Sequence, residues 1–200
     1  MSENTASALN LRMTVYCALF TALIIIGGYI AIPVPVSPVP IVLSDFFVML
    51  TGLFLGLKHG LISTTLFLAL GVLGLPVFAG GNAGLAVFYG PTGGFLLGYP
   101  LMAASIGFIT SKMRPSVVAH LFALIVGNIL LYSLGVPWLK FQMNMSWSAA
   151  LAAGLTPFII GAVIKIAVAC TLGHTLLPRF KQALAGQISA CVQQTGNENE

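Results

Sequence analysis

Six long apolar stretches follow one another along the chain, at residues 13–32, 41–57, 60–76, 95–111, 116–135 and 149–176. A helix needs about 20 mostly apolar residues to cross a bilayer, because the hydrocarbon core is roughly 30 Å thick and each residue rises about 1.5 Å. The stretches therefore predict an all-α integral membrane protein, a compact bundle of six transmembrane helices in one domain over residues 1–176. The second and third stretches are short for a span, as if tilted, irregular or shielded by neighbouring helices.

The composition leaves little room for a soluble domain. Of the 200 residues, 58% are hydrophobic and only 6% are charged, whereas about a quarter of a typical soluble chain is charged. The net charge of +4 is too small and too scattered for a nucleic-acid groove. These numbers exclude soluble enzymes, nucleic-acid-binding proteins and disordered regulators.

Most basic residues lie on one side of the predicted spans. That side holds Arg12, Lys58, Lys112, Arg114, Arg179 and Lys181. The opposite connections hold Lys140 alone. Because Lys and Arg collect in the cytoplasmic loops of membrane proteins, both termini are predicted to be cytoplasmic, with a cytoplasmic tail at 177–200. An even number of spans agrees with this orientation.

Two of the three predicted external connections have an unusual composition. In residues 33–40 prolines alternate with other residues, which imposes an extended backbone, and residues 77–94 are rich in glycine. Lipid offers no hydrogen bonds, so backbone groups in such connections need cover from protein or a place at a cavity. We therefore expect a pocket near the external side, roofed by these two connections.

Two ionisable residues besides those at the span boundaries lie within apolar sequence, Asp45 and Lys165. A charge at this depth costs a few kcal/mol, so each is a candidate site residue. Lys165 either binds an anionic or carbonyl ligand, which its depth favours, or pairs with Asp45 or with backbone carbonyls. Asp45 either belongs to the site or only anchors the start of its helix.

Three further polar or aromatic residues have alternative roles. Asn82, between glycines, offers donors and an acceptor to a ligand of mixed polarity, or serves simply as a turn residue. Tyr89 either stacks on a flat ligand or joins the aromatic belt of the membrane interface. His120 is expected to hydrogen-bond to a neighbouring helix.

The motifs of hydrolytic enzymes are missing. The segment Gly90–Gly94 lacks the lysine of a phosphate-binding loop, and there is no HExxH or GxSxG motif. The three cysteines are far apart and show no metal-ligand spacing. We expect neither ATP hydrolysis nor another enzymatic activity, and neither a metal nor a cofactor.

The sequence LPVFAGGNAG at 75–84 is followed by GPTGGFLLG at 90–98. These two segments are similar to the signature of the BioY family, the biotin-specific substrate-capture (S) components of energy-coupling factor (ECF) transporters. SPVPI at 37–41 and PFIIGAVIK at 157–165 resemble its first external loop and its sixth-span motif. The motifs stand in the family's order, and the similarity extends from about Leu11 to His174.

The resemblance implies biotin as the transported ligand, held near the external side under the first two external loops. It implies that Asn82 and Lys165 bind biotin and that Tyr89 lies in the motif that wraps it. Glycines of the same motif include Gly80, Gly81, Gly84, Gly93 and Gly94. It also implies residence in a bacterial cytoplasmic membrane and three partner proteins, a transmembrane coupling subunit and two cytoplasmic ATPases. The coupling subunit would contact the first helix at Ala18 and Ala22.

One position departs from the family pattern. Three residues before its lysine, the sixth-span motif usually has an acid, and this chain has Ala162. We hypothesise that Asp45 takes over from the missing acid and balances Lys165 across the pocket. Two other functions remain open from the sequence, an S component for a different vitamin and a structural membrane subunit that transports nothing.

Overall fold

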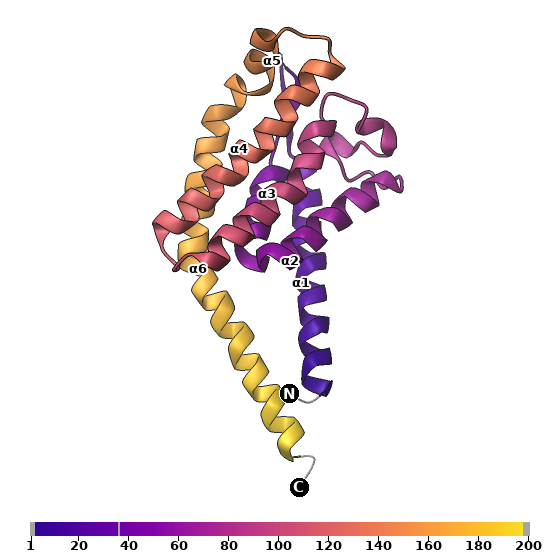
Figure 1. Ribbon diagram of the computed structural model, residues 1–200. Helices are drawn as coiled ribbons and strands as arrows, with labels where there is room; N and C mark the ends of the chain where they lie inside the picture. The colour runs from indigo at the N-terminus through magenta and orange to yellow at the C-terminus, as the bar shows by residue number, and fades with distance from the viewer. Residues whose placement is uncertain (1–2, 36, 198–200) are drawn as a thin grey trace.

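The computed structural model describes residues 3–35 and 37–197, with side chains described for 11–35 and 37–183. In chain order its elements are α1 (Glu3–Tyr29), β1 (Ala31–Val34), β2 (Ser37–Val42), α2 (Ser44–Val72), the 3₁₀ turns η1 (Ala79–Gly81) and η2 (Leu85–Val87), α3 (Gly93–Lys112), α4 (Val117–Gln142), α5 (Trp147–Gly154) and α6 (Thr156–Asn197). The fold is mostly helical, as the sequence predicts, and the helices form one bundle with both chain ends on the same side (Figure 1).

Within the described residues, five helices rather than six are long and apolar enough to cross a membrane. The difference lies in α2, which covers most of both short predicted spans, 41–57 and 60–76. Its backbone is broken at Gly56, where φ is 72° and ψ is −168°. Lys58 therefore follows a break within α2 and does not lie in a loop between separate helices.

The break at Gly56 turns α2 back on itself. A Cβ added to Gly60 would lie 3.6 Å from the Cα atom of Gly52, although eight residues of straight helix span about 12 Å. Helix α1 contacts both parts: Ser44 donates to the carbonyl of Ile24 at 2.9 Å, and Thr21 donates to that of Ser63 at 3.0 Å. The two parts of α2 are thus side by side.

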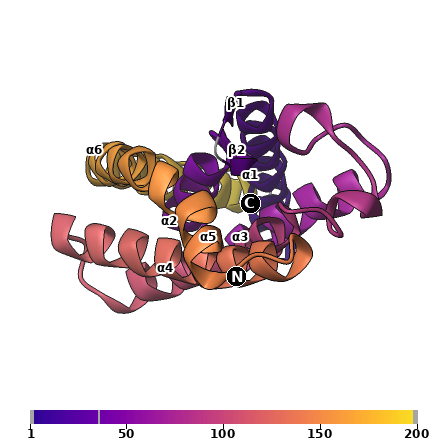
Figure 2. The same cartoon turned by 90° about the horizontal axis from the view of Figure 1, so that it is seen from above.

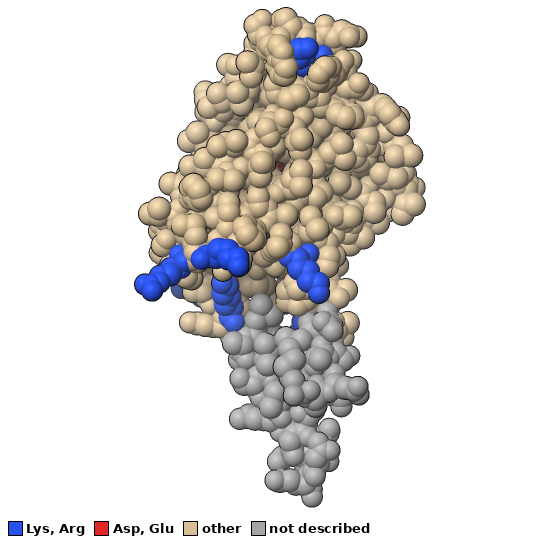
Figure 3. All heavy atoms as spheres, in the orientation of Figure 1, with Lys and Arg blue, Asp and Glu red and all other residues tan. Residues whose placement is uncertain are grey.

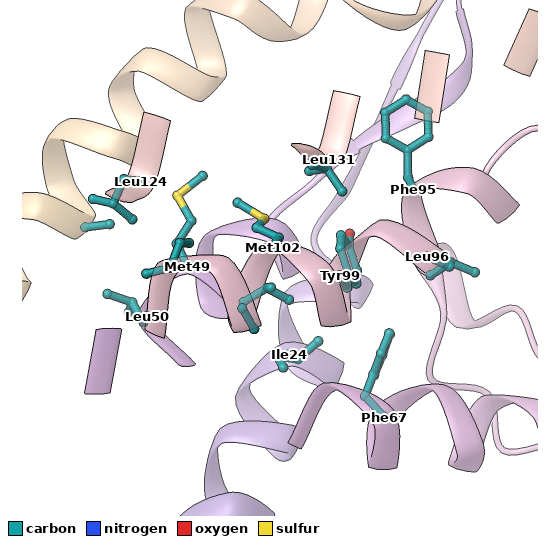
Figure 4. Packing of buried hydrophobic residues seen from close by; sticks show 14 of the residues in the cluster. Ile24, Met49, Leu50, Phe67, Phe95, Leu96, Tyr99, Met102, Leu124 and Leu131 are labelled. Carbon is teal, nitrogen blue, oxygen red and sulfur yellow. The ribbon is translucent and has the colours of Figure 1, made fainter. Parts of the chain in front are cut away.

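Helix α3 packs between α2 and α4 through small residues (Figures 1 and 2). A Cβ at Gly94 would lie 2.3 Å from that of Trp138 in α4, and one at Gly107 would lie 2.3 Å from the carbonyl carbon of Gly56. Such close approach is how helices gain packing energy in lipid, where the hydrophobic effect does not drive them together. Figure 4 shows Met102 and Tyr99 of α3 among the buried side chains of the core.

The proline-rich connection is an antiparallel β-hairpin of β1 and β2, which pairs Ala31 with Val42 and Ile32 with Ile41. The extended backbone was predicted from the prolines, but its pairing was not. Just after the hairpin, the amide of Leu43 donates to the carbonyl of Gly27 at 3.1 Å, so the hairpin is tied to the end of α1.

The last two spans also differ from the prediction. Helix α4 extends to Gln142, so Trp138 and Lys140 lie in this helix and not in the connection predicted to follow the span 116–135. The predicted span 149–176 is divided between α5 and α6 at Leu155. The backbone of α6 then continues past residue 176 to Asn197, so most of the predicted tail is helical.

The two ends of the bundle differ in how many basic side chains they carry. Basic side chains gather around the end of the bundle that carries the chain termini, and another lies at the opposite end (Figure 3). At that opposite end, the ammonium of Lys140 lies 5.0 Å from the ring centre of Trp147 and 4.8 Å from that of Phe141. We call the first the basic end and the second the apolar end.

We predict that Gly107→Ala destabilises the protein by about 1–3 kcal/mol, because a methyl group there would press on the backbone of α2 at its break. The matched control is Gly161→Ala in α6, where an added Cβ meets nothing within 4 Å. Thermal unfolding in detergent should show a lower midpoint for Gly107→Ala and an unchanged or higher one for the control. Equal midpoints would contradict the close contact between α3 and the break.

Candidate functional site

A cavity lies near the apolar end, between the two connections and the helices beneath them. The hairpin contributes Val39, Pro40 and Val42, and the second connection contributes Phe78, Ala79 and Thr92. Helices supply the rest of the lining: Ser44, Asp45, Phe67, Phe95, Leu96, Tyr99, Leu131, Tyr132, Phe158 and Lys165. The cavity thus has the roof that the composition of the connections predicted, and we call it the roofed cavity.

An ion pair between α2 and α6 lies in this cavity. The ammonium Nζ of Lys165 is 2.7 Å from Oδ1 and 2.9 Å from Oδ2 of Asp45. Both side chains are nearly buried, with 12% and 11% of their surface exposed. The two residues singled out by their depth in the sequence are therefore in contact across 120 positions. The structure thus shows the pairing alternative for Lys165, and because the pair lines the cavity, binding of a ligand by Lys165 stays a prediction.

The ion pair uses the donors of Lys165 more completely than the acceptors of Asp45. Lys165 has three N–H donors. Three oxygens lie within hydrogen-bonding distance of its Nζ: the two carboxylate oxygens of Asp45 and the carbonyl oxygen of Val42, at 2.6 Å. Asp45 Oδ1 also accepts from the amide of Phe46 at 2.9 Å. Since a carboxylate has about four lone-pair sites, Oδ2 keeps one acceptor position. In this arrangement the carboxylate, not the ammonium, has capacity to bind a further group.

Two tyrosines that the sequence analysis did not single out line the cavity beside the pair. Tyr99 of α3 is buried and Tyr132 of α4 is partly buried, and the charge of Asp45 acts on both phenols. A tyrosine in the middle of an apolar span brings a hydroxyl that needs a partner when buried. Such a hydroxyl in an apolar span could have drawn attention to both tyrosines in the sequence. It does not, however, distinguish a residue that lines a cavity from one at the membrane interface.

Asn82 lies outside the roofed cavity, in an adjoining hollow of about 270 Å³. The two spaces share Pro40, Ala79 and Thr92 in their linings. The side-chain amide of Asn82 donates to the carbonyl of Ala79 at 2.7 Å, as a turn residue would, while its Oδ1 makes no hydrogen bond among the described residues. Asn82 thus fills the turn role and also presents a free acceptor to the second hollow, which we call the outer hollow.

The glycines of the second connection shape its backbone. Gly81 and Gly84 have φ values of 81° and 86°, a conformation that other residues rarely adopt. Gly93 allows close packing, since a Cβ there would lie 2.0 Å from the carbonyl oxygen of Phe88 and 2.9 Å from Nε1 of Trp138. None of the three lines either space. Tyr89 is 76% exposed and also lies outside both linings.

Ala162, at the position of the missing acid, is buried but does not line the roofed cavity. Lys165, the lysine of the same motif, forms its ion pair with the carboxylate of Asp45. On α1, Ala18 and Ala22 are exposed, on a face with the exposed side chains of Val15 and Ile26.

The chain resembles known proteins over most of its length. The model of the BioY family matches residues 1–182. The biotin transporter BioY of Thermotoga maritima is 38% identical over 166 residues, which cover 83% of this chain and 96% of that protein. BioY2 of Lactococcus lactis, also a biotin transporter, is 36% identical over 160 residues, or 80% of this chain and 87% of that protein.

A solved structure shares the fold. The crystal structure at 2.1 Å of the S-component for biotin from an ECF-type ABC transporter superposes with a TM-score of 0.80 at 36% identity, and the match covers 88% of this chain and 94% of that one. These relatives are transport proteins, so the expectation that the chain is not an enzyme is confirmed. The family match over residues 1–182, the identities and the shared fold together establish that the chain belongs to the BioY family.

Proposed function

We propose that this protein captures biotin at the external face of a bacterial cytoplasmic membrane and is the substrate-specific S component of an ECF-type transporter. The observation that carries the proposal is the roofed cavity, whose apolar lining surrounds one buried ion pair and two tyrosines. The relatives named as biotin transporters support the choice of ligand.

The chemistry of the cavity suits biotin. Its thioether ring and aliphatic chain match the aromatic lining of Phe67, Phe95 and Phe158. Its ureido group donates and accepts hydrogen bonds, and the spare lone pair of Asp45 Oδ2 is an acceptor for a ureido N–H. We propose that Lys165 holds Asp45 in place for this contact. In this arrangement Asp45 stands in for the acid that the family carries where this chain has Ala162.

Entry of biotin requires the roof to move. The roofed cavity measures only about 50 Å³, whereas pockets for small molecules usually measure at least about 300 Å³. The outer hollow adds space on the far side of Thr92 and Ala79. We propose that biotin extends between the two spaces, so that Asn82 Oδ1 contacts the part outside the roofed cavity. The glycines at 81, 84 and 93 then set the shape of the second connection, and a shift of that connection would bring Tyr89 over the ligand.

The proposed orientation follows from charge. The basic end carries Lys112 and Arg114 at the end of α3, and the positive-inside rule places it in the cytoplasm with both termini. Each half of α2 then makes one short crossing, which gives six crossings and leaves the roofed cavity at the external side. The turn between the two halves then lies at the basic end, where α3 packs closely against it through Gly107.

The partners we propose are a transmembrane coupling subunit and two cytoplasmic ATPases. This chain has no phosphate-binding loop, so the energy for transport comes from other subunits. The face of α1 around Ala18 and Ala22 supports contact with the coupling subunit, because its small residues let another helix approach closely.

Biotin binding by the purified protein tests the proposal. Equilibrium dialysis in detergent should show saturable binding of biotin and none of riboflavin or thiamine. Binding of another vitamin instead of biotin would overturn the choice of ligand, and binding of none, with no ligand-dependent thermal shift, would favour a structural subunit.

The ion pair predicts a non-additive stability effect. Lys165→Met leaves the buried carboxylate of Asp45 with one amide donor, and Asp45→Asn leaves an uncompensated buried ammonium. Breaking such a pair costs roughly 3–5 kcal/mol, while replacing both partners is nearly neutral. The thermal midpoint without biotin should therefore fall less in the double variant than in either single variant.

The exposed lysine at position 58 provides the control, because Lys58→Met removes a charge outside the cavity and should leave the midpoint unchanged. If the two single effects simply add in the double variant, Asp45 and Lys165 do not compensate each other. Biotin affinity of the same variants should fall in both singles, since each disturbs the group proposed to meet the ureido nitrogen.

Asn82→Ala should weaken biotin binding by roughly 5- to 10-fold, the value of one hydrogen bond of about 1–1.5 kcal/mol. The backbone at Asn82 has φ of −68°, which alanine adopts without strain, so the fold should be kept. Ser148→Ala, at the same end of the molecule and outside both spaces, is the control. Unchanged affinity in Asn82→Ala would show that biotin does not reach the outer hollow.

A further inference from the structure

A third cavity lies at the basic end, far from the proposed biotin site. It measures about 190 Å³ and forms where the break in α2 meets the end of α3, the start of α4 and α6. Its lining includes Gly56, Thr110, Arg114, His120 and Lys181. We call it the basal hollow. Nothing in the proposed capture of biotin uses it.

The basal hollow is positively charged without a counter-charge. Arg114 and Lys181 make no hydrogen bond or ion pair among the side chains described at 11–35 and 37–183. Within those ranges the sole acid is Asp45, and that carboxylate is paired with Lys165 in the roofed cavity. Two full positive charges therefore share this space with no anion from the described part of the chain.

A buried histidine adds an unsatisfied polar group to the same lining. His120 is only 4% exposed, and its Nδ1 has no hydrogen-bond partner. The prediction that His120 hydrogen-bonds to a neighbouring helix is therefore wrong, because the described residues include no such partner. Leaving a buried polar group unpaired is unfavourable, and a ligand that reached this nitrogen would supply the missing hydrogen bond.

The backbone around the hollow does not cancel this charge. The first half of α2 and the whole of α3 end there, and Leu55 and Thr110 near those ends line the space. Each helix C-terminus carries about half a negative charge, so the two together offset about one of the two full positive charges of Arg114 and Lys181. The start of α4, at Ala119 and His120, contributes the opposite partial charge of a helix N-terminus.

Exposed apolar side chains flank the hollow. On the first turns of α4, Val118 is 72% exposed and Phe122 is 51% exposed, and Leu176 of α6 is 42% exposed. A ligand held by the cations can therefore lay an apolar part against the outside of the bundle. Basic pockets between transmembrane helices on the cytoplasmic side characteristically bind anionic lipid headgroups.

We propose that the basal hollow binds the phosphate group of an anionic phospholipid, with Arg114 and Lys181 as its charged contacts and His120 as a hydrogen-bonding group. Free phosphate shares this chemistry, but it has no part that would use the flanking apolar surface. The site is independent of the biotin proposal.

The test measures phospholipid binding to the full-length protein in detergent by native mass spectrometry. Phosphatidylglycerol should bind the wild-type chain with a single tight site, and the zwitterionic phosphatidylcholine should not. In the double variant Arg114→Gln/Lys181→Gln the affinity should fall about 10- to 30-fold, as expected for two cations near a phosphate. Both side chains are exposed, so the variant should fold, and an unchanged thermal midpoint without lipid verifies this.

The matched control is Lys58→Gln/Arg179→Gln, which removes the same charge from the basic end at residues that do not line the hollow. It should keep the affinity within about twofold. An equal loss in both double variants would mean diffuse attraction to the whole basic end and would overturn the site. A thermal shift given by inorganic phosphate but not by phosphatidylglycerol would overturn the lipid as its source, and binding of neither would overturn the phosphate site.

His120→Phe separates the histidine from the cations. It keeps the shape and both charges of the hollow and should weaken phosphatidylglycerol binding by a smaller factor than the double charge variant. Unchanged binding in His120→Phe would remove the imidazole from the site while leaving the cation contacts in place.

Discussion

In a bilayer every backbone N–H and C=O needs a partner from protein, and this constraint governs the parts of the chain that are not plain helix. The proline-rich connection cannot form a helix, so it pairs with itself as β1 and β2, and Leu43 extends that pairing to the end of α1. At the break in α2, Gly107 of α3 packs closely against the backbone of Gly56. Buried hydroxyls obey the same rule, as when Thr64 donates to the carbonyl of Gly60.

The same constraint explains why the polar residues of the core are few and grouped. A lone charge at the depth of Asp45 or Lys165 would cost several kcal/mol, and the two offset each other only because α2 and α6 bring them within 2.7 Å. The carbonyl of Val42 completes the coordination of the ammonium. A polar site inside an apolar bundle is thereby held by one contact that ties the hairpin, α2 and α6 together.

Much of this arrangement could be predicted from the sequence, because a segment that crosses lipid must be long and apolar and its charged residues lie mainly outside it. Apolar length located the helices, basic residues marked one end, and the depth of Asp45 and Lys165 identified the pair that lines the cavity. The fold-back at Gly56 could not be predicted as part of one helix, since a glycine followed by Lys58 and His59 also fits a loop between two helices. Tyr99 and Tyr132 were missed because a tyrosine in an apolar stretch has no pattern that separates a cavity from a membrane interface. The isolation of His120 depends on which helices meet there, and spacing along the chain does not contain that information.

The end of α1 contacts both segments that roof the cavity. Gly27 accepts from Leu43 beside the hairpin, and the hydroxyl of Tyr29 donates to the carbonyl of Pro76 at the start of the second connection. The same helix exposes Ala18 and Ala22 farther along its length. The two segments of the roof are therefore joined to each other through one helix end, and neither Leu43 nor Pro76 can move away from α1 without breaking a hydrogen bond.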